Sequence, residues 1–219
     1  MQEQLCMTLK ADMSNSWWKK FIGDFKHPIT IGEIGVGEGD SLLGFRDLAH
    51  PDSEVHGFDW FKLVEGMPFE DMFELRDEEL MDAGIYLHEL NQNDRNNQRE
   101  RLKKLNVNFD IIVDDGGHKP LHHQNSLIEF WPYLNEGGYY IIEDMQIFEA
   151  HRNDTKTKVE YEITDLNNTA LILNSWNGRM LCKQSPYWTK EEQQEISNTI
   201  DTIDRYQGRT NIYSLIRKK

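Results

Sequence analysis

Cysteine is scarce in this sequence, and long apolar runs are missing from it. Only Cys6 and Cys182 occur among the 219 residues, so no zinc site with CxxC spacing can form. They could make one disulfide, but so few cysteines favour a reduced pair in the cytosol. No stretch approaches the roughly 20 apolar residues of a membrane-spanning helix, and the polar N-terminus lacks a signal-peptide pattern. We therefore expect a soluble, cytoplasmic protein without a membrane partner.

Basic charge is also in short supply. The chain has 24 Lys and Arg against 38 Asp and Glu, a formal net charge of -14. Such a surface repels a phosphate backbone. The densest basic clusters, residues 99–104 and 217–219, are short. The composition therefore argues against DNA or RNA as a partner and leaves small molecules and other protein subunits.

Strand-like and helix-like segments alternate along the chain, without an internal repeat or a low-complexity linker. Strands are expected at residues 29–34, 54–59, 84–90, 109–113, 137–144, 179–183 and 211–216. Helices are expected from the glycine-rich turn to residue 48, and at 94–105, 120–134, 164–176 and 189–206. This alternation is typical of an α/β protein. We predict one domain over residues 1–219, with a Rossmann-like, doubly wound seven-stranded sheet, mostly parallel with an antiparallel last strand, and helices on both faces.

Two segments stand outside this alternation. An N-terminal extension, residues 1–28, contains the helical stretch "SWWKKFIGDF". The spacing places its aromatic residues on one helical face, which favours packing on the core or on a second subunit of a homo-oligomer, with a substrate lid as the alternative. Residues 61–83 mix aromatic, Met and acidic side chains over a length that is long for a simple crossover. This segment is a candidate flap over a pocket.

A glycine-rich turn, "IGEIGVGEGDS", follows the first expected strand. Gly35, Gly37 and Gly39 let the backbone turn tightly and approach a ligand at the carboxyl end of the strand. A dinucleotide fingerprint would need glycine at position 40, where Asp40 stands. Glycine turns also occur for purely structural reasons. The pattern from Glu33 onward, E-x-G-x-G-x-G, resembles motif I of class I S-adenosylmethionine-dependent methyltransferases.

Further polar residues follow the second and third strands, where a cofactor would extend from the turn. Asp59 lies about 20 residues past the glycines, where an acid can accept both ribose hydroxyls; a turn or helix cap is its alternative role. Gln92 and Asp94 follow the third strand and are candidates to reach the adenine, although Asp94 could simply cap the next helix. Glu33 could likewise be a buried structural acid.

Acids and a histidine follow strands four and five, in "FDIIVDDGGHKP" and "GGYYIIED". Because parallel strands end at the same edge of a sheet, Asp115, Glu143 and Asp144 should converge there. Three carboxylates repel one another unless neutralised, and Mg²⁺ or a similar hard divalent cation does this best. The oxygen-only set argues against zinc. Asp114 is expected to be structural or to lie near the cofactor.

His118 stands three residues past Asp115, and its ordinary pKa near 6.5 suits a general base. Taken singly, it could be a solvated turn histidine, and strand-end acids often cap a following helix. His122 and His123, on the helix after the motif, are expected to form a surface or pocket-wall pair rather than to act as ligands.

The two strand-end motifs together are similar to a more specific family. "FDIIVDDGGHKP" and "FWPYLNEGGYYIIEDMQ" resemble the D-D-G-S-H … L-x-P-G-G-x-Y-x-I-E-D pattern of metal-dependent sugar O-methyltransferases of the mycinamicin and macrocin type. The wider family includes cephalosporin hydroxylase-like proteins. The resemblance covers roughly residues 29–146. It implies Asp115, Glu143 and Asp144 as Mg²⁺ ligands and His118 as the base. Gly117 stands where that family usually has Ser, and residues 135–136 replace a common Lys-Pro; neither change removes a ligand.

These patterns predict an S-adenosylmethionine- and Mg²⁺-dependent O-methyltransferase that acts on a hydroxyl of a sugar or another small vicinal diol. One alternative is a catechol-type enzyme with the same cofactor and metal. A second is a non-catalytic cofactor-binding scaffold or regulatory protein. A nicotinamide-dependent dehydrogenase is disfavoured because the sequence lacks the G-x-G-x-x-G pattern.

Overall fold

The strands of the chain form one mixed sheet. The computed structural model describes residues 16–61, 77–145, 147, 163–164, 167–177, 185–207 and 212–219. Its seven-stranded sheet has the order β3-β2-β1-β4-β5-β7-β6, and β7 pairs antiparallel with both β5 and β6. This confirms the predicted α/β, Rossmann-like fold with an antiparallel last strand. By its contacts the chain divides into two compact units, residues 1–89 and 90–219, and the single-domain organisation stays a prediction.

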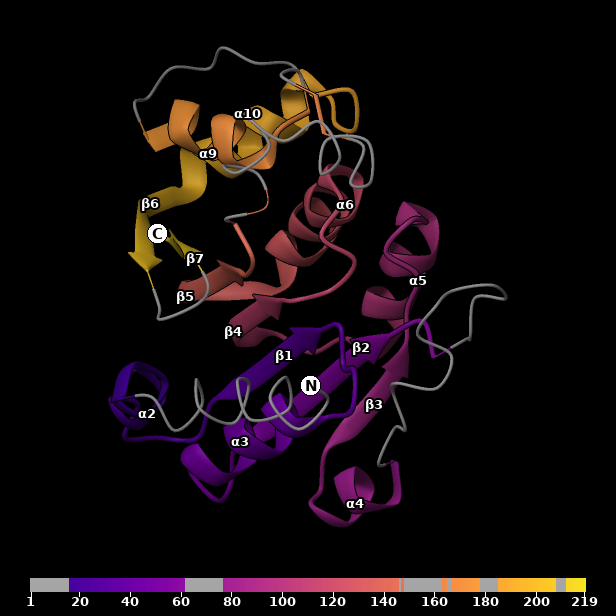
Figure 1. Cartoon of the computed structure of the whole chain (residues 1–219), viewed down its shortest axis with the longest axis vertical. Helices are drawn as coiled ribbons and strands as arrows, with labels where there is room; N and C mark the ends of the chain where they lie inside the picture. The colour runs from indigo at the N-terminus through magenta and orange to yellow at the C-terminus, as the bar shows by residue number, and fades with distance from the viewer. Residues whose placement is uncertain are drawn as a thin grey trace. The chain divides into compact units, whose positions relative to one another are not determined.

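The first unit carries three parallel strands and their helices (Figure 1). Its elements are α2 (Ser16–Gly23), β1 (Thr30–Ile34), α3 (Asp40–Leu48), β2 (Glu54–Asp59), α4 (Asp77–Asp82) and β3 (Tyr86–Glu89). β2 pairs in parallel with β1 and with β3. In α2, Trp18 and Ile22 are buried, and the Trp18 ring meets Phe45 of α3 edge-on at 5.2 Å. The apolar face of α2 therefore packs on α3.

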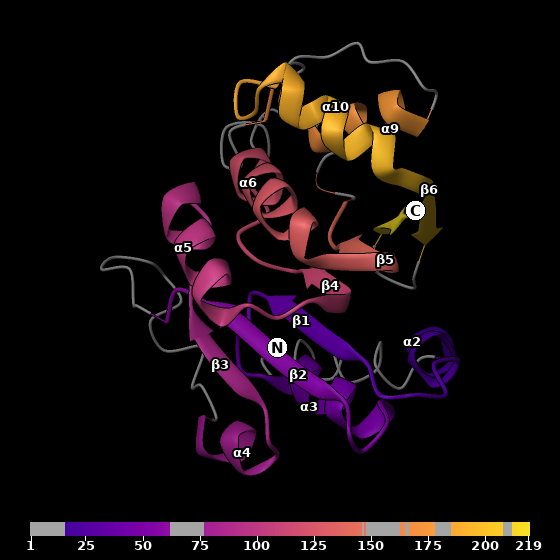
Figure 2. The ribbon, with the colours of Figure 1, turned by 180° about the vertical axis from the view of Figure 1, so that it is seen from behind.

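The second unit carries the remaining four strands, seen from behind in Figure 2. Its elements are α5 (Arg95–Leu105), β4 (Phe109–Asp114), α6 (Pro120–Phe130), the 3-10 turn η1 (Trp131–Tyr133), β5 (Leu134–Ile142), α9 (Thr169–Asn177), α10 (Lys190–Thr199), β6 (Ile200–Gln207) and β7 (Ile212–Lys218). β4 and β5 are parallel. The β4 side chains Phe109, Ile111, Ile112 and Val113 are all 0% exposed, so β4 is covered on both faces, as its apolar residues predict.

Two predicted elements of the C-terminal part were wrong in extent. The helix expected over 189–206 ends at Thr199, and β6 begins at once. Ile200, Thr202 and Ile203 suit a pleated strand better than a helix, and β6 pairs with β7 along its length. The helix expected from residue 164 begins only at Thr169. Asn167 Oδ1 accepts the Thr164 N–H at 2.7 Å, so a side-chain-held turn precedes the helix.

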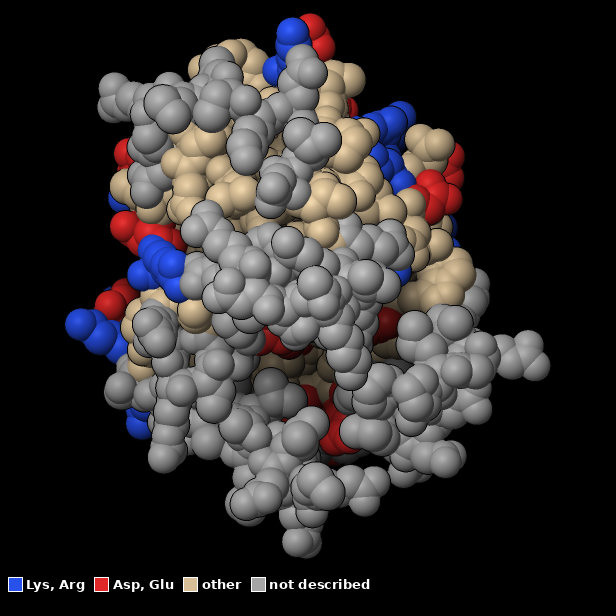
Figure 3. Space-filling model, turned by 45° about the horizontal axis from the view of Figure 1, so that its top comes forward, with Lys and Arg blue, Asp and Glu red and all other residues tan. Residues whose placement is uncertain are grey.

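The remaining predicted segments fall partly or wholly outside the described residues. The strand expected at 179–183 and residues 62–76 of the candidate flap lie there. Among the residues that are described, no helix is both long and apolar enough to cross a membrane. On the face shown in Figure 3, acidic and basic side chains lie beside one another at several places on the described surface. Among the described residues, Arg217 Nη1 lies 3.3 Å from Asp201 Oδ2.

Candidate functional site

The turn after β1 has a backbone that demands glycine. The φ angles of Gly35, Gly37 and Gly39 are 91°, 53° and 89°, a region that residues with a side chain rarely adopt. A Cβ on Gly39 would also lie 2.6 Å from Leu80 Cδ1. Gly39 is the N-cap of α3, which begins at Asp40. The glycine spacing therefore serves a tight strand-to-helix turn.

Asp59, at the end of β2, holds this turn through its carboxylate. Oδ2 accepts the Val36 N–H at 2.8 Å, and Oδ1 accepts the Phe61 N–H at 3.2 Å. A carboxylate oxygen can accept two hydrogen bonds, so these contacts leave capacity for ligand hydroxyls. The turn role foreseen as an alternative is present, and the ribose contact stays a prediction.

Glu33 is a buried acid at the end of β1. Its side chain is in contact with Ser41, whose hydroxyl donates to Oε2 at 2.7 Å, and the residue is 1% exposed. Burial, which Ser41 partly offsets, together with the nearby Asp59 charge raises the pKa of Glu33 to about 8. Glu33 is therefore protonated at neutral pH in this structure, and its contact with a cofactor stays a prediction.

The raised pKa of Glu33 predicts how stability changes with pH. Between pH 4.5 and about 8 the folded state holds a proton here that the unfolded state has lost. The unfolding free energy contributed by this group should therefore fall as pH rises, with a slope of up to about 1.4 kcal/mol per pH unit. Urea unfolding at several pH values should show a flatter profile for Glu33→Gln. Identical slopes in the two proteins would contradict the assignment.

Three side chains gather after β4 and β5 in the second unit. His118 Nε2 lies 3.5 Å from Asp144 Oδ2 and 3.9 Å from Asp115 Oδ1. One potential ligand atom from each of these residues lies within 4.8 Å of the others. Two carboxylates and an imidazole form a donor set that suits a divalent cation. The structure thus brings together Asp115, His118 and Asp144, three of the residues singled out in the sequence.

Glu143 stands apart from this cluster among the described residues. Its residue exposure is 8%, and its N–H donates to the Asp114 carbonyl at 3.0 Å. That bond continues the pairing of β5 with β4. The role of Glu143 as a metal ligand stays a prediction.

Two members of the cluster have a strained backbone. His118 and Asp144 both have φ of 52°, in the left-handed region. Outside glycine this conformation costs on the order of 1–3 kcal/mol and concentrates at functional sites. Sequence spacing gives no sign of it, because neither residue is a glycine.

Burial lowers the pKa of two histidines at the cluster. Burial lowers the pKa of His118 below its ordinary value, and the Asp144 carboxylate opposes that shift. His123 is fully buried, and its ring meets that of His118 edge-on at 5.9 Å. Burial, and then the neighbouring His118 and His122, lower the pKa of His123 well below the ordinary value. His123 is thus no surface residue but lies behind His118.

Gly117 and His122 account for the departure from the D-D-G-S-H pattern. A Cβ on Gly117 would lie 2.0 Å from His122 Nδ1. The His122 ring is itself within hydrogen-bonding distance of Asn93, with 2.7 Å between Nε2 and Oδ1. The imidazole therefore fills the space that a serine side chain would need.

Asp114 and Asp115 have separate roles although they are adjacent. Asp114 is fully buried and accepts hydrogen bonds from the Tyr140 hydroxyl and the Gln92 amide, both at 3.0 Å. Burial, partly offset by these bonds, raises its pKa to about 6. Asp94 caps α5 by accepting the N–H groups of Asn96 and Asn97. The Asp114 carboxylate is therefore tied to Tyr140 of β5 and to Gln92, and the cofactor contacts of Asp114, Gln92 and Asp94 stay predictions.

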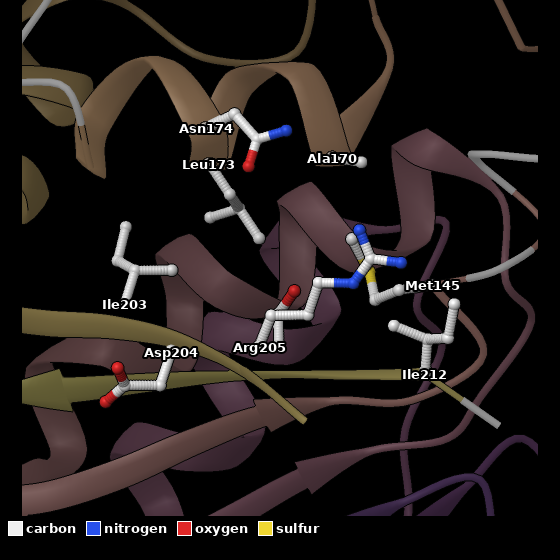
Figure 4. A pocket seen from close by; sticks show the side chains of 9 residues that line it. Met145, Ala170, Leu173, Asn174, Ile203, Asp204, Arg205 and Ile212 are labelled. Atoms are coloured by element: carbon white, nitrogen blue, oxygen red, sulfur yellow. The ribbon is translucent and has the colours of Figure 1, made fainter. Parts of the chain in front are cut away.

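A small pocket opens next to the cluster, in the second unit (Figure 4). Met145, which follows Asp144 directly, lines one end of it. The α9 side of the pocket is lined by Ala170, Leu173 and Asn174, and the β6–β7 side by Ile203, Asp204, Arg205, Ile212 and Ser214. Its volume is ≈ 70 Å³. In Figure 4 the Arg205 guanidinium reaches toward Met145, so the pocket combines apolar walls with a cationic hydrogen-bond donor.

Comparison with known proteins gives matches in both sequence and structure. Residues 33–145 match the family described as "Methyltransferase domain". A tetracenomycin rhamnosyl 3'-O-methyltransferase of Streptomyces olivaceus is 27% identical over 148 residues, 60% of this chain and 34% of the relative. The mycinamicin VI 2''-O-methyltransferase of Micromonospora griseorubida is 38% identical over 56 residues, 25% of this chain and 14% of the relative.

The structural match extends further along the chain. A structure of the MycE methyltransferase, solved in complex with Mg and SAH, gives a TM-score of 0.58 at 18% identity. It covers 92% of this chain and 48% of MycE. The likeness to MycE shows that this chain has the Rossmann-like methyltransferase fold. The chain thus matches about a third of the length of the tetracenomycin relative and about half of the MycE chain.

Proposed function

The chain belongs to the methyltransferase domain family, and from this premise we propose that it transfers a methyl group from S-adenosylmethionine to a sugar hydroxyl. Membership confirms the family predicted from motif I and the strand-end acids. The tetracenomycin relative supports the choice of acceptor, because its name describes methylation of a rhamnosyl group. The substrate is accordingly a glycoside with neighbouring free hydroxyls.

The observation that carries this proposal is the cluster of Asp115, His118 and Asp144. One imidazole and two carboxylates lie within one small volume, and this arrangement supports a reaction in which a hydroxyl is deprotonated. We propose that Asp115 and Asp144, with Glu143, hold Mg²⁺. When bound, the cation would supply Lewis-acid polarisation of two neighbouring substrate hydroxyls.

The residues of the chain then perform the proton transfer. His118 is neutral at pH 7 because burial lowers its pKa, so it is able to take a proton. Its Nε2 atom faces the carboxylates of Asp115 and Asp144 and is the atom that would accept the hydroxyl proton. The hydroxyl oxygen receives the methyl group, and S-adenosylhomocysteine leaves. Since the methyl donor is already activated, the protein contributes mainly orientation and deprotonation.

We assign the part of the glycoside beyond the reacting diol to the pocket next to Met145. Its apolar walls suit the C–H face of a sugar ring, and Arg205 can donate to a hydroxyl. Arg205→Ala should raise the KM for methyl α-L-rhamnopyranoside about tenfold, the effect of losing one charge-assisted hydrogen bond. Arg217→Ala is the matched control, because Arg217 pairs with Asp201 outside the pocket lining. Equal KM values in Arg205→Ala and the wild type would contradict this assignment.

A methyl-transfer assay tests the proposed function directly. The protein is incubated with S-adenosylmethionine labelled in its methyl group, Mg²⁺, and either methyl α-L-rhamnopyranoside or catechol, and the products are analysed by mass spectrometry. The expected product is the mono-O-methyl rhamnoside, formed with equimolar S-adenosylhomocysteine. If only catechol is methylated, the protein is a catechol-type O-methyltransferase and the proposed sugar substrate is wrong. Binding of the cofactor product in calorimetry without any transfer would support a non-catalytic role.

A further inference from the structure

Gln92 lies between β3 and α5, and the hydrogen-bonding capacity of its side chain is used within the second unit. The amide Nε2 donates to Asp114 Oδ1 at 3.0 Å and to Ser126 Oγ at 3.1 Å. The amide Oε1 accepts the Gly117 N–H at 2.9 Å. Both amide hydrogens and the amide oxygen are therefore engaged, and these bonds determine which end of the amide is nitrogen.

Two of these partners flank a member of the cluster. Asp114 and Gly117 are anchored by the same amide, and Asp115 lies between them in the chain. His118 follows the second anchor directly. The fit is close, because a Cβ on Gly116 would lie 2.1 Å from Gln92 Oε1. The loop that carries the carboxylate and the base therefore folds around this one side chain.

The backbone of Gln92 is fixed from its other side. Its carbonyl accepts the Asn125 Nδ2 at 3.0 Å and the Gln98 Nε2 at 3.1 Å. Asn125 belongs to α6 and Gln98 to α5, and both side chains are buried. The anchor therefore rests on two helices rather than on a free loop.

We propose that Gln92 is a positioning residue that holds Asp115, in the loop that also carries His118, in the arrangement needed to bind the divalent cation. This inference rests on the proposed function. Metal ligands must be placed to within about 0.2 Å, and a loop of this length would otherwise relax. His118 in particular has a left-handed φ of 52°, which persists only where the surroundings impose it. The Gly117 anchor, one residue earlier, supplies that constraint.

Binding of Mn²⁺ to the purified full chain, measured by calorimetry without cofactor or acceptor, tests this role. Gln92→Ala should weaken Mn²⁺ affinity about 10- to 100-fold, the range found when groups that orient metal ligands are lost. Gly116→Ala should give a similar weakening, because its methyl group displaces the amide without removing it. The affinity for S-adenosylhomocysteine should change less than about threefold in both variants.

Gln124→Ala is the matched control. Gln124 is also a fully buried glutamine, and its Nε2 donates to the Asn167 carbonyl at 2.7 Å and to Thr169 Oγ1 at 3.2 Å. These bonds, with the one that the Ser185 hydroxyl donates to Gln124 Oε1, tie Gln124 to Asn167, to the start of α9 and to Ser185, and not to the Asp115 loop. Gln124→Ala should lower the Tm as Gln92→Ala does and leave Mn²⁺ affinity within about threefold of the wild type.

The outcomes separate this role from its rivals. Unchanged Mn²⁺ affinity in Gln92→Ala, with weaker binding of S-adenosylhomocysteine, would overturn the positioning role and favour the cofactor contact. Equal losses of Mn²⁺ affinity in Gln92→Ala and Gln124→Ala would show that general destabilisation of the fold, and not the positioning of Asp115, weakens metal binding. A wild-type protein that binds no Mn²⁺ would contradict the metal site itself, and with it this inference. Metal binding by the wild type with no effect of Gln92→Ala overturns the inference alone.

Discussion

Replacing Asp115 with asparagine should abolish metal-dependent methyl transfer. The amide is nearly the same size as the carboxylate but carries no charge, so the proposed metal site loses one of its three anionic ligands. Mn²⁺ affinity should fall more than about 100-fold, beyond the 10- to 100-fold typical of residues that only orient ligands. Calorimetry on the metal-free protein measures this directly, and the methyl-transfer rate should fall in parallel at fixed Mg²⁺.

The control for this prediction removes an acid elsewhere in the same unit. Glu195 lies on α10 and is exposed, so Glu195→Gln changes the net charge equally without touching the cluster. It should bind Mn²⁺ as the wild type does. If Asp115→Asn and Glu195→Gln lose the same small amount of affinity, the effect is one of general charge, and Asp115 is not a ligand.

Replacing His118 with asparagine should lower the turnover about 10²- to 10⁴-fold, the usual contribution of a general base. Asparagine suits this position better than alanine, because φ is 52° and asparagine tolerates the left-handed region. Mn²⁺ affinity should change less than about threefold, and so should the affinity for S-adenosylhomocysteine. Initial rates at saturating substrate measure the turnover, and calorimetry measures the affinities for Mn²⁺ and S-adenosylhomocysteine.

The same experiment distinguishes two roles that the geometry allows for His118. Its Nε2 lies 3.5 Å from Asp144 Oδ2, so the imidazole is close enough to the carboxylates to share a metal ion with them. If His118→Asn loses Mn²⁺ affinity as strongly as Asp115→Asn, His118 is a ligand and not the base. His122→Asn serves as the control, since His122 faces Gly117 and Asn93.

Much of the fold could be predicted because hydrophobic patterns alternate clearly. The apolar run of β4 and the glycine turn before α3 required no tertiary information. The segment from Ile200 to Gln207 is different, because its helical and strand tendencies compete. Pairing with β7, the next strand along the chain, decides in favour of the strand, and the pattern of residues 200–207 taken alone does not show this partner. The late start of α9 also depends on a specific contact. The Asn167 side chain accepts the Thr164 N–H and holds a turn before the helix, which the pattern of hydrophobic residues does not show.

The gathering of Asp115, His118 and Asp144 among the described residues could be predicted, but not the absence of Glu143 from their group or how the three residues are held. The rule that parallel strands end at one edge was enough to bring Asp115 to Asp144. Three features depended on three-dimensional contacts: the Gln92 amide between Asp114 and Gly117, the burial of His123 behind His118, and the left-handed backbones. The Gln92 bonds join residues more than 20 positions apart in the sequence. Such contacts cannot be predicted from the composition of the chain or from the spacing of its residues.

The most direct test of the central claim is the initial rate of methyl transfer to methyl α-L-rhamnopyranoside as a function of Mg²⁺ concentration, after the protein has been stripped with EDTA. The account predicts no rate above background in EDTA and a saturable recovery as Mg²⁺ is restored. It also predicts that Asp115→Asn shows no such recovery at the same Mg²⁺ concentrations. A full rate in excess EDTA would contradict the assignment of the Asp115, His118 and Asp144 cluster as a metal-dependent active site.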